Sequence, residues 1–383
     1  MSNFIFQTSK KIIYGEGTTG LVGKEAAGFG KTAMIITGKG SSKKTGALDK
    51  VIDSLKENLL EVIVFDKVES DPSVKTIRLG VEVAKANNID VIIALGGGSP
   101  LDAAKAINMM ITNDGDILDY EKKGPEKEGL PLIAVPTTAG TGSEVSKYVV
   151  ITDTDRKIKM LIGGETLIPS VAILDPVLTV MMPPAVTAAT GMDAITHAIE
   201  AFISKVSQPI TEMYAISAIK LITENLIKAV LDGGNLEARQ NMMIGQMYAG
   251  LAFSNASVAL VHAMSRPLGA YFKVPHGLAN AILLPSVMEF NRAACPEKFK
   301  LIAEAMGENT ENLSLREASL LAVKAVNKLF EETGLPRTLK EIGVEKEGIP
   351  KLAEDAIVSG STNFNPRKPE LSELIAIYNK IYW

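Results

Sequence analysis

The chain has 383 residues, of which 46% are hydrophobic and 22% are charged, and its formal net charge is −4. This length allows two domains with substantial cores, and the composition is typical of a soluble globular protein. Because the sequence has no basic block, a nucleic-acid partner is not expected. The most apolar stretch, at residues 167–192, is interrupted by prolines and Asp175, so a membrane span is not expected either.

In the first half of the chain, apolar strand-like runs alternate with amphipathic stretches. The strand-like runs are residues 32–37, 61–65, 89–95, 132–135 and 148–152, and the amphipathic stretches include 48–59 and 74–87. This alternation predicts a doubly wound α/β domain with a mostly parallel sheet.

A glycine-rich segment, LGGGSPLD at residues 95–102, directly follows one of the predicted strands. Gly96, Gly97 and Gly98 would let backbone N–H groups approach a ligand closely. We expect the next helix to begin with Ser99 as its N-cap and Asp102 at the position of a capping-box acid, so that the helix N-terminus can bind a pyrophosphate. The segment matches neither GxGxxG nor a P-loop, and taken alone a plain strand–turn–helix corner explains it equally well.

A hydroxyl-rich loop, PTTAGTGSE at residues 136–144, follows the next predicted strand. Its hydroxyls suit hydrogen bonds to a nucleotide, although a solvated surface loop could have the same composition. Two such loops after successive strands favour a nucleotide site. We assign the cofactor contacts to Gly96, Gly97, Gly98, Ser99, Asp102, Thr137, Thr138, Thr141 and Ser143.

The pattern changes after Pro183 and Pro184, where helical periodicity replaces the β-branched runs. The expected helices include residues 188–203, 211–230, 236–264, 315–333 and 371–381. We therefore place a domain boundary here and predict an α/β dinucleotide-binding domain at residues 1–183 and an all-α domain at residues 184–383.

The chain's cysteine content and N-terminus bear on its location. The single cysteine, Cys295, cannot form an internal disulfide, which fits a reducing compartment. The N-terminal residues lack the apolar segment of an export signal. We expect a cytoplasmic protein in which Cys295 is an ordinary thiol.

All three histidines of the chain lie in the helical half, and with one aspartate they form a metal-ligand pattern. Asp193 and His197 are four residues apart, so they share one face of a predicted helix. His262 lies on a later helix, and His276 follows a short loop and is expected to open the next helix. Imidazole and carboxylate are ligands that a divalent transition metal accepts, so the helical domain is predicted to bind a metal ion.

Taken together, these segments resemble the iron-containing (group III) alcohol dehydrogenases over essentially the whole chain. The resemblance is carried by Ile13-Tyr-Gly15, GGGSPLDAAKA at 96–106, PTTAGTGSEV at 136–145, AILDP at 172–176, GMDAITHAIEAF at 191–202, VPHGLANAILLP at 274–285 and NPR at 365–367. It implies an α/β dinucleotide domain followed by a helical domain, and a homodimer or larger homo-oligomer.

The resemblance also implies the chemistry of the site. Asp193, His197, His262 and His276 would be the metal ligands, with Fe²⁺ as the usual ion and Zn²⁺ or another divalent ion possible. Zinc-containing relatives usually lack a counterpart of His197, so its presence favours iron. The ion would act as a Lewis acid on the oxygen of a small alcohol or aldehyde, and the nicotinamide cofactor would carry the hydride. With every histidine used as a ligand, we expect the proton to exchange through water or a substrate hydroxyl.

One departure from the family pattern concerns the substrate. Many members carry His-Ala-Met-Ala-His, whereas this chain has His262-Ala-Met-Ser-Arg266. Arg266 shares a helix face with His262, and a guanidinium binds carboxylate or sulfonate groups in a bidentate way. We therefore hypothesise a short aldehyde with an acidic end, such as a semialdehyde or sulfo-aldehyde; alternatively Arg266 pairs with an acid or faces solvent. Phe253 either walls the substrate pocket or packs in the core.

A second departure concerns the cofactor. Members that prefer NAD often carry an acid at the position of Gly38, which would repel a 2′-phosphate. Glycine leaves room for that phosphate, and Ser41, Ser42 and the following lysines could bind it, so NADP(H) is favoured. A plain surface loop that leaves NAD(H) as the cofactor is the alternative. Lys159 matches a family lysine near the cofactor, although a lysine in a charged loop is usually solvated.

Three other functions are compatible with parts of the pattern. A lyase similar to dehydroquinate synthase uses NAD and zinc, but its site is rich in basic residues. A polyol dehydrogenase similar to glycerol dehydrogenase is the second alternative. A metal-storing protein, with a closed site and no cofactor, is the third.

Overall fold

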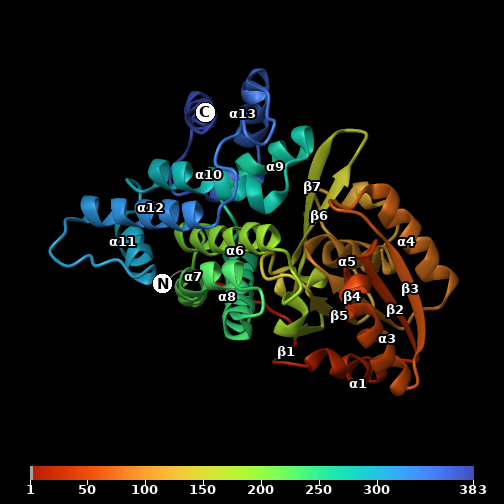
Figure 1. Ribbon diagram of the computed structural model, residues 1–383. Helices are drawn as coiled ribbons and strands as arrows, with labels where there is room; N and C mark the ends of the chain where they lie inside the picture. The colour runs from red at the N-terminus through yellow and green to blue at the C-terminus, as the bar shows by residue number, and fades with distance from the viewer. Residues whose placement is uncertain (1–2) are drawn as a thin grey trace. The chain divides into compact units, whose positions relative to one another are not determined.

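The computed structural model describes residues 3–383, which form two compact units (Figure 1). The first unit is Gln7–Met181, and the second is Met182–Trp383 together with residues 3–6. All the strands lie in the first unit and the longest helices in the second, so the α/β and helical halves expected from the sequence are both present.

A six-stranded, fully parallel sheet forms the centre of the first unit. Its strand order is β1-β8-β5-β4-β2-β3. The strands are β1 (Lys11–Tyr14), β2 (Thr32–Gly38), β3 (Glu61–Val68), β4 (Val91–Gly96), β5 (Leu132–Pro136) and β8 (Val171–Leu174). The order reverses between β2 and β4, and ligands of open α/β sheets bind at such a point, beyond the carboxyl ends of the strands.

Helices cover both faces of this sheet, because alternate residues of each strand point to opposite sides. Ala33 and Ile35 pack with α1 (Val22–Ala27) and α3 (Ala47–Glu57). The intervening side chains of β2 pack on the other face with residues of α4 (Val74–Ala86) and α5 (Gly98–Thr112). Both faces of the central strands are therefore buried, as the continuous apolar runs predicted.

One predicted strand does not belong to the parallel sheet. Residues 148–152 do form a strand, β6 (Tyr148–Asp153), but it pairs antiparallel with β7 (Ile158–Gly163) in a separate two-stranded sheet. A local apolar pattern identifies a strand but not its partner, since pairing depends on the rest of the fold.

The helix after the glycine-rich loop begins earlier than expected. α5 starts at Gly98 with Gly97 as its N-cap, and no side chain caps it. Ser99 instead accepts a hydrogen bond from the backbone N–H of Asp71 at 3.2 Å. Asp102 is not a capping-box acid, because its carboxylate accepts from the Ser143 hydroxyl and the Val150 N–H. Because Gly97 has no side chain, no N-cap side chain accepts a hydrogen bond from the first backbone N–H groups of α5.

The second unit is built from helices around a buried central one. α6 (Pro184–Ile203) is almost wholly buried from Gly191 onward and packs against α7, α8 and α10. The others are α7 (Pro209–Leu231), α8 (Leu236–Ala256), α9 (Leu260–Phe272), α10 (His276–Asn291), α11 (Pro296–Ala305), α12 (Leu315–Glu332), α13 (Ile349–Ile357) and α14 (Leu371–Lys380). Short helices account for the rest, including α2 (Ser41–Lys44) in the first unit and the 3₁₀ turn η7 (Gly360–Phe364) in the second.

The long helix predicted at residues 236–264 is wrong, because it is two helices. α8 ends at Ala256, Ser257 takes a left-handed φ of 62°, and α9 begins at Leu260. The two helix axes differ by 101°. Asn and Ser side chains compete with helical backbone hydrogen bonds, and the break gives α9 an N-terminus close to His262.

No single helix among the described residues has both the length and the apolar composition needed to cross a membrane. One bent pair, α8 with α9, meets those criteria only when its two members are taken together.

Candidate metal centre and cofactor loops

Helix α6 carries three acidic or imidazole side chains on one face. Asp193, His197 and Glu200 follow each other at spacings of four and three residues, so they lie along one stripe of the helix. Asp193, His197 and Glu200 expose 2%, 6% and 1% of their surface to solvent, respectively. Buried polar groups at such positions need partners, and the neighbouring helices supply them.

Glu200 holds the start of α9 and orients His262. Its carboxylate accepts from the backbone N–H of Ala259 at 2.9 Å and of Val261 at 2.5 Å, which satisfies donors that the helix leaves unpaired. The same carboxylate lies 2.6 Å from Nδ1 of His262. A carboxylate at Nδ1 selects the tautomer whose Nε2 lone pair is free to bind a metal.

Burial sets the charge state of this pair. Burial raises the pKa of the Glu200 carboxyl to about 7, although the N–H groups of Ala259, Val261 and His262 oppose that shift. Burial, followed by the charges of His197 and Arg266, holds the pKa of His262 well below 6.5. His262 is therefore a neutral imidazole, which is the form that binds metals.

His276 reaches the same place because α10 begins very close to α6. His276 is the first residue of α10 and Gly277 the second. A Cβ at Gly277 would lie 2.4 Å from the carbonyl oxygen of Ala189 and 3.4 Å from Cβ of Asp193. The glycine therefore permits an approach that no other residue could make without a shift of the helices. The His276 side chain is 35% exposed, so this is the more open side of the cluster.

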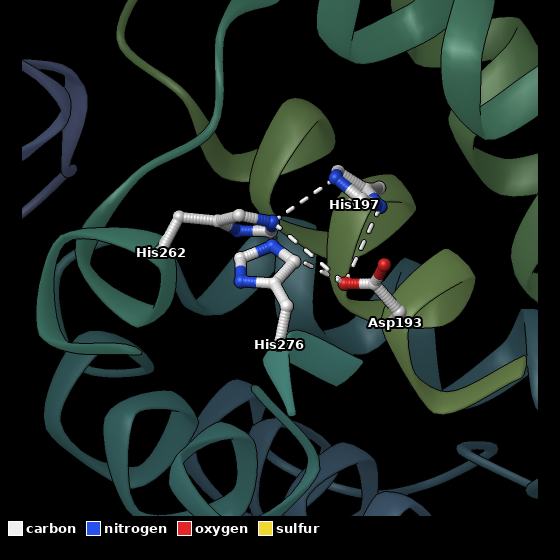
Figure 2. Close-up of side chains that lie close together, drawn as sticks. All are labelled: Asp193, His197, His262 and His276. Carbon is white, nitrogen blue, oxygen red and sulfur yellow. Dashed lines mark hydrogen bonds and ion pairs between the residues drawn. The ribbon is translucent and has the colours of Figure 1, made fainter. Parts of the chain in front are cut away.

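The structure brings the four predicted ligands together (Figure 2). One donor atom from each of Asp193, His197, His262 and His276 lies within 4.8 Å of the other three. Oδ1 of Asp193 is 3.8 to 3.9 Å from a ring nitrogen of each histidine, and the Nε2 atoms of His197 and His262 are 3.0 Å apart.

This donor set fits a divalent transition metal. Three imidazoles and one carboxylate suit iron or zinc. Nδ1 of His197 is buried and has no hydrogen-bond partner, which is costly for a polar atom in a site without a ligand. Within residues 3–383 these four form the one group with converging ligand atoms of this kind.

Of the two residues predicted to contact substrate, Phe253 touches this cluster and Arg266 lies one helical turn after His262. The Phe253 ring stacks on the His197 ring, with centroids 4.4 Å apart. Arg266 is half-buried, and its Nη1 donates to the hydroxyls of Ser359 at 3.2 Å and Ser361 at 3.0 Å. Its charge acts on His262, whose pKa it helps to lower.

Sequence reasoning missed Glu200 and Asn280, both of which contact the predicted ligands. For Glu200 a signal existed, because it continues the helical spacing of Asp193 and His197 and is the next acidic residue on that helix. Asn280 is four residues after His276 and so shares its helix face.

In the α/β unit, the predicted cofactor residues gather at the carboxyl edge of the sheet. The register pairs Thr37 with Leu95, and Gly96 with Pro136. Gly38 and Gly96 therefore end neighbouring strands at the point where the strand order reverses.

The glycine-rich and hydroxyl-rich loops pack directly on each other. A Cβ at Gly97 would lie 3.2 Å from Cγ2 of Thr138, and one at Gly98 would lie 2.7 Å from Cγ2 of Thr141. Thr137 joins the same edge by donating its N–H to the Gly96 carbonyl at 2.9 Å. Asp102, which is half-buried, accepts a hydrogen bond from the Ser143 hydroxyl at 2.6 Å.

The remaining predicted cofactor residues differ in accessibility. Ser41 is exposed, whereas Ser42 is 2% exposed and accepts a hydrogen bond from the Thr37 hydroxyl. Lys159 is not solvated: its side chain is 4% exposed, and Nζ lies 2.7 Å from a carboxylate oxygen of Asp71. The same Asp71 donates its N–H to Ser99, so Lys159 is tied to the start of α5.

Comparison with known proteins gives matches over the whole chain. Residues 9–176 match the family model described as iron-containing alcohol dehydrogenase, and residues 187–382 match the model for the C-terminal part of the Fe-containing alcohol dehydrogenase family. The chain is 44% identical over 355 residues to 1,3-propanediol dehydrogenase of Citrobacter freundii, which is 92% of each chain.

Solved structures give the same result. A 1,3-propanediol oxidoreductase superimposes with a TM-score of 0.97 at 41% identity, covering 100% of both chains. The sulfoacetaldehyde reductase of Bifidobacterium kashiwanohense, solved in complex with NAD⁺, superimposes with a TM-score of 0.89 at 30% identity, covering 100% of this chain and 99% of that one.

Proposed function

The chain belongs to the iron-containing alcohol dehydrogenase family and is an oxidoreductase acting on CH–OH donors, and we propose that it interconverts a short aldehyde bearing an acidic group with its alcohol, using NADP(H). Metal and nicotinamide cofactor follow from the family and from the Asp/His cluster. The acidic substrate and the 2′-phosphate are our proposals.

The observation that carries the proposal is the convergence of Asp193, His197, His262 and His276. These residues would hold Fe²⁺, with Zn²⁺ or another divalent ion as alternatives. When bound there, the ion supplies Lewis-acid chemistry to a substrate oxygen. The chain's part is to present neutral imidazoles and one carboxylate, and Glu200 does this for His262 by accepting its Nδ1–H.

The α/β unit would bind the cofactor, which carries the hydride. The uncapped N–H groups at the start of α5 suit a pyrophosphate, and the hydroxyls of Thr138 and Thr141 border the same glycines. Asp102 acts indirectly, by fixing Ser143. With all three histidines assigned to the ion, no imidazole remains to carry a proton, so the proton exchanges through water or a substrate hydroxyl.

Arg266 supports an anionic substrate. It lies one helical turn after His262, two serine hydroxyls fix its guanidinium, and its charge is felt at His262. A carboxylate or sulfonate on the substrate would meet this charge while the aldehyde oxygen reaches the ligand cluster. The sulfoacetaldehyde reductase to which the chain is similar acts, by its name, on an aldehyde with a sulfonate end. The 1,3-propanediol dehydrogenase relative favours an uncharged diol as the second candidate.

Replacing Arg266 with glutamine tests whether the substrate is anionic. In the wild type, loaded anaerobically with Fe²⁺, kcat/KM should be highest for succinic semialdehyde or sulfoacetaldehyde and lower for butanal. The variant should lose about 10- to 100-fold in kcat/KM on the acidic aldehydes, since a charge-assisted hydrogen bond contributes about 1.5–3 kcal/mol. Its activity on butanal should stay near that of the wild type. A wild-type preference for butanal would contradict the anionic substrate, and absence of activity on every aldehyde would contradict the function itself.

Gly38 supports NADP(H). A side chain added there would meet nothing closer than 3.7 Å, and Ser41, Lys43 and Lys44 nearby are exposed. Position 38 thus carries no acidic side chain that would repel a 2′-phosphate, and the nearby exposed lysines could pair with one. NAD(H), the form of cofactor present in the sulfoacetaldehyde reductase structure, is the alternative, and rates with NADH and NADPH at equal concentration separate the two. Assembly as a homodimer or larger homo-oligomer, the lack of nucleic-acid and membrane partners, the boundary at residue 183 and a cytoplasmic location all stay predictions.

A further inference from the structure

The side-chain amide of Asn280 lies among the predicted metal ligands. Its Nδ2 is 2.6 Å from Oδ1 of Asp193 and 3.2 Å from Nε2 of both His262 and His276. Asn280 is 0% exposed. One amide nitrogen thus contacts donor atoms from three helices, α6, α9 and α10.

The orientation of this amide follows from its surroundings. Turning it over would put Oδ1 at 2.6 Å from the Asp193 carboxylate oxygen, with no proton between two acceptors. Nδ2 must therefore face the ligands. As a result Oδ1 is buried without a hydrogen-bond partner, which costs stability. A buried polar atom without a partner calls for an explanation, and the contacts of Nδ2 with the ligand atoms supply one.

The amide has two N–H groups and three acceptors around it. Oδ1 of Asp193 and, in the tautomers that bind a metal, the Nε2 atoms of His262 and His276 carry lone pairs, which repel one another when no cation lies between them. An N–H₂ group facing them lowers this repulsion and keeps the atoms converged. When a cation binds, the imidazole lone pairs point to the cation and no longer accept from the amide. The hydrogen bond to the Asp193 carboxylate, the shortest of the three, can persist in both the metal-free and the metal-bound site.

We propose that Asn280 is a positioning residue of the metal centre. Its amide gathers the donor atoms of Asp193, His262 and His276 before the ion binds, and it fixes the Asp193 carboxylate once the ion has bound. This inference rests on the metal-binding role proposed above. Groups that orient ligands in this way commonly change metal affinity by about 10- to 100-fold when they are removed.

The test uses Co²⁺ as the probe, because its visible absorption reports the ligands directly and requires no activity. Metal-free wild type, Asn280→Ala and Asn280→Asp are titrated with Co²⁺ against a competing chelator. The matched control is Asn291→Ala, since Asn291 is equally buried on the same helix but bonds to Asn365. Thermal unfolding of each metal-free protein measures general destabilisation.

We expect Asn280→Ala to bind Co²⁺ about 10- to 100-fold more weakly than the wild type, with altered absorption bands. Asn280→Asp, which keeps the shape but has no N–H, should also show altered bands and covers the case in which the alanine variant does not fold. Asn291→Ala should keep the wild-type affinity and spectrum even where its melting temperature falls.

Wild-type affinity and spectrum in the Asn280 variants would overturn this role and leave the metal centre intact. An equal loss in Asn291→Ala would overturn it too, because destabilisation alone would then explain the effect. Failure of the wild type to bind Co²⁺ would overturn the metal centre itself, and the role of Asn280 with it.

Discussion

Gly38 is the residue at which cofactor preference can be tested most directly. A Cβ built there meets the Pro100 ring and the Val68 carbonyl at 3.7 Å, which is ordinary contact, so an aspartate fits. Its carboxylate would repel a 2′-phosphate and could bind a ribose hydroxyl instead. We predict that Gly38→Asp lowers the ratio of NADPH to NADH activity by at least about tenfold, which is about 1.4 kcal/mol.

The control for this substitution is Gly20→Asp, which adds the same charge at a glycine with open space around it. Initial rates with each cofactor, at one aldehyde concentration, measure the ratio. If Gly38→Asp left the ratio at its wild-type value, the position would not contact the adenosine ribose.

Single residues also show how far the sequence could predict the site. The four ligand candidates were identifiable because imidazole is rare in this chain and two of the four are at helical spacing. Ser42 shows the opposite case, since its place in a polar loop predicted cofactor contact, yet its hydroxyl is buried against Thr37. Residue type predicts chemistry, whereas burial and partners depend on the packed chain.

At the scale of elements, Glu200 links α6 to the N-terminus of α9. Replacing it with alanine removes a helix cap, which costs about 0.5–2 kcal/mol, and frees His262 to change tautomer. We predict that Glu200→Ala unfolds at lower urea concentration and binds Fe²⁺ about 10- to 100-fold more weakly. Glu212→Ala is the control, because that carboxylate pairs with Lys298 instead. A variant with wild-type metal affinity would show that His262 needs no orientation by Glu200.

The contact between α10 and α6 gives a second prediction at this scale. In Gly277→Ala the new methyl group meets the Ala189 carbonyl oxygen at 2.4 Å, so α10 has to move away and take His276 with it. Overpacking of this kind costs about 1–3 kcal/mol.

We expect Gly277→Ala to stay folded, by circular dichroism, but to lose most of its metal affinity in a chelator competition. Gly360→Ala, in open space of the same unit, should retain it. Equal affinity of Gly277→Ala and the wild type would mean that the close approach of the two helices does not position His276.

The elements that were predicted and those that were missed differ in length and partners. The central strands were found because their apolar runs are continuous, whereas the edge strand β1, with four half-buried or exposed residues, gives no such pattern. The break between α8 and α9 was missed because both helices are apolar and only three residues, 257–259, separate them, of which Ser257 has a positive φ. Local periodicity does not show that two helical segments meet at an angle.

For the molecule as a whole, topology joins sites that are distant in sequence. The order β5-β4-β2 brings the loops after residues 38, 96 and 136 to one edge of the sheet. In the helical unit, three helices bring together donors from residues 193 to 276. The alternation of strands and helices predicted the first arrangement in outline, because parallel sheets place the carboxyl ends together. The scarcity of histidine and the helical spacing of Asp193 and His197 predicted a metal site in the helical unit, whereas the assignment of all four residues to one ion was strengthened by the family resemblance.

Stability of the molecule should depend on pH through Lys105, which is buried on α5. Its Nζ donates to the carbonyls of Ser146 and Tyr148, and burial lowers its pKa from 10.5 to about 8, opposed by the charges of Asp102 and Glu144. Below pH 8 the lysine is charged in both the folded and the unfolded chain, so the folded state bears the full cost of burying the charge. Between pH 8 and 10.5 the unfolded chain binds more protons, so the free energy of unfolding rises with pH. The full change is about 3 kcal/mol, since one pKa unit corresponds to about 1.4 kcal/mol.

Urea unfolding of the wild type and of Lys105→Met from pH 7 to 10 measures this effect. Above pH 8 the free energy of unfolding of the wild type should rise relative to that of Lys105→Met. For the exposed Lys56→Met it should change with pH as it does in the wild type. Parallel curves for Lys105→Met would mean that the lysine keeps its ordinary pKa and that its carbonyl partners replace its hydration in full.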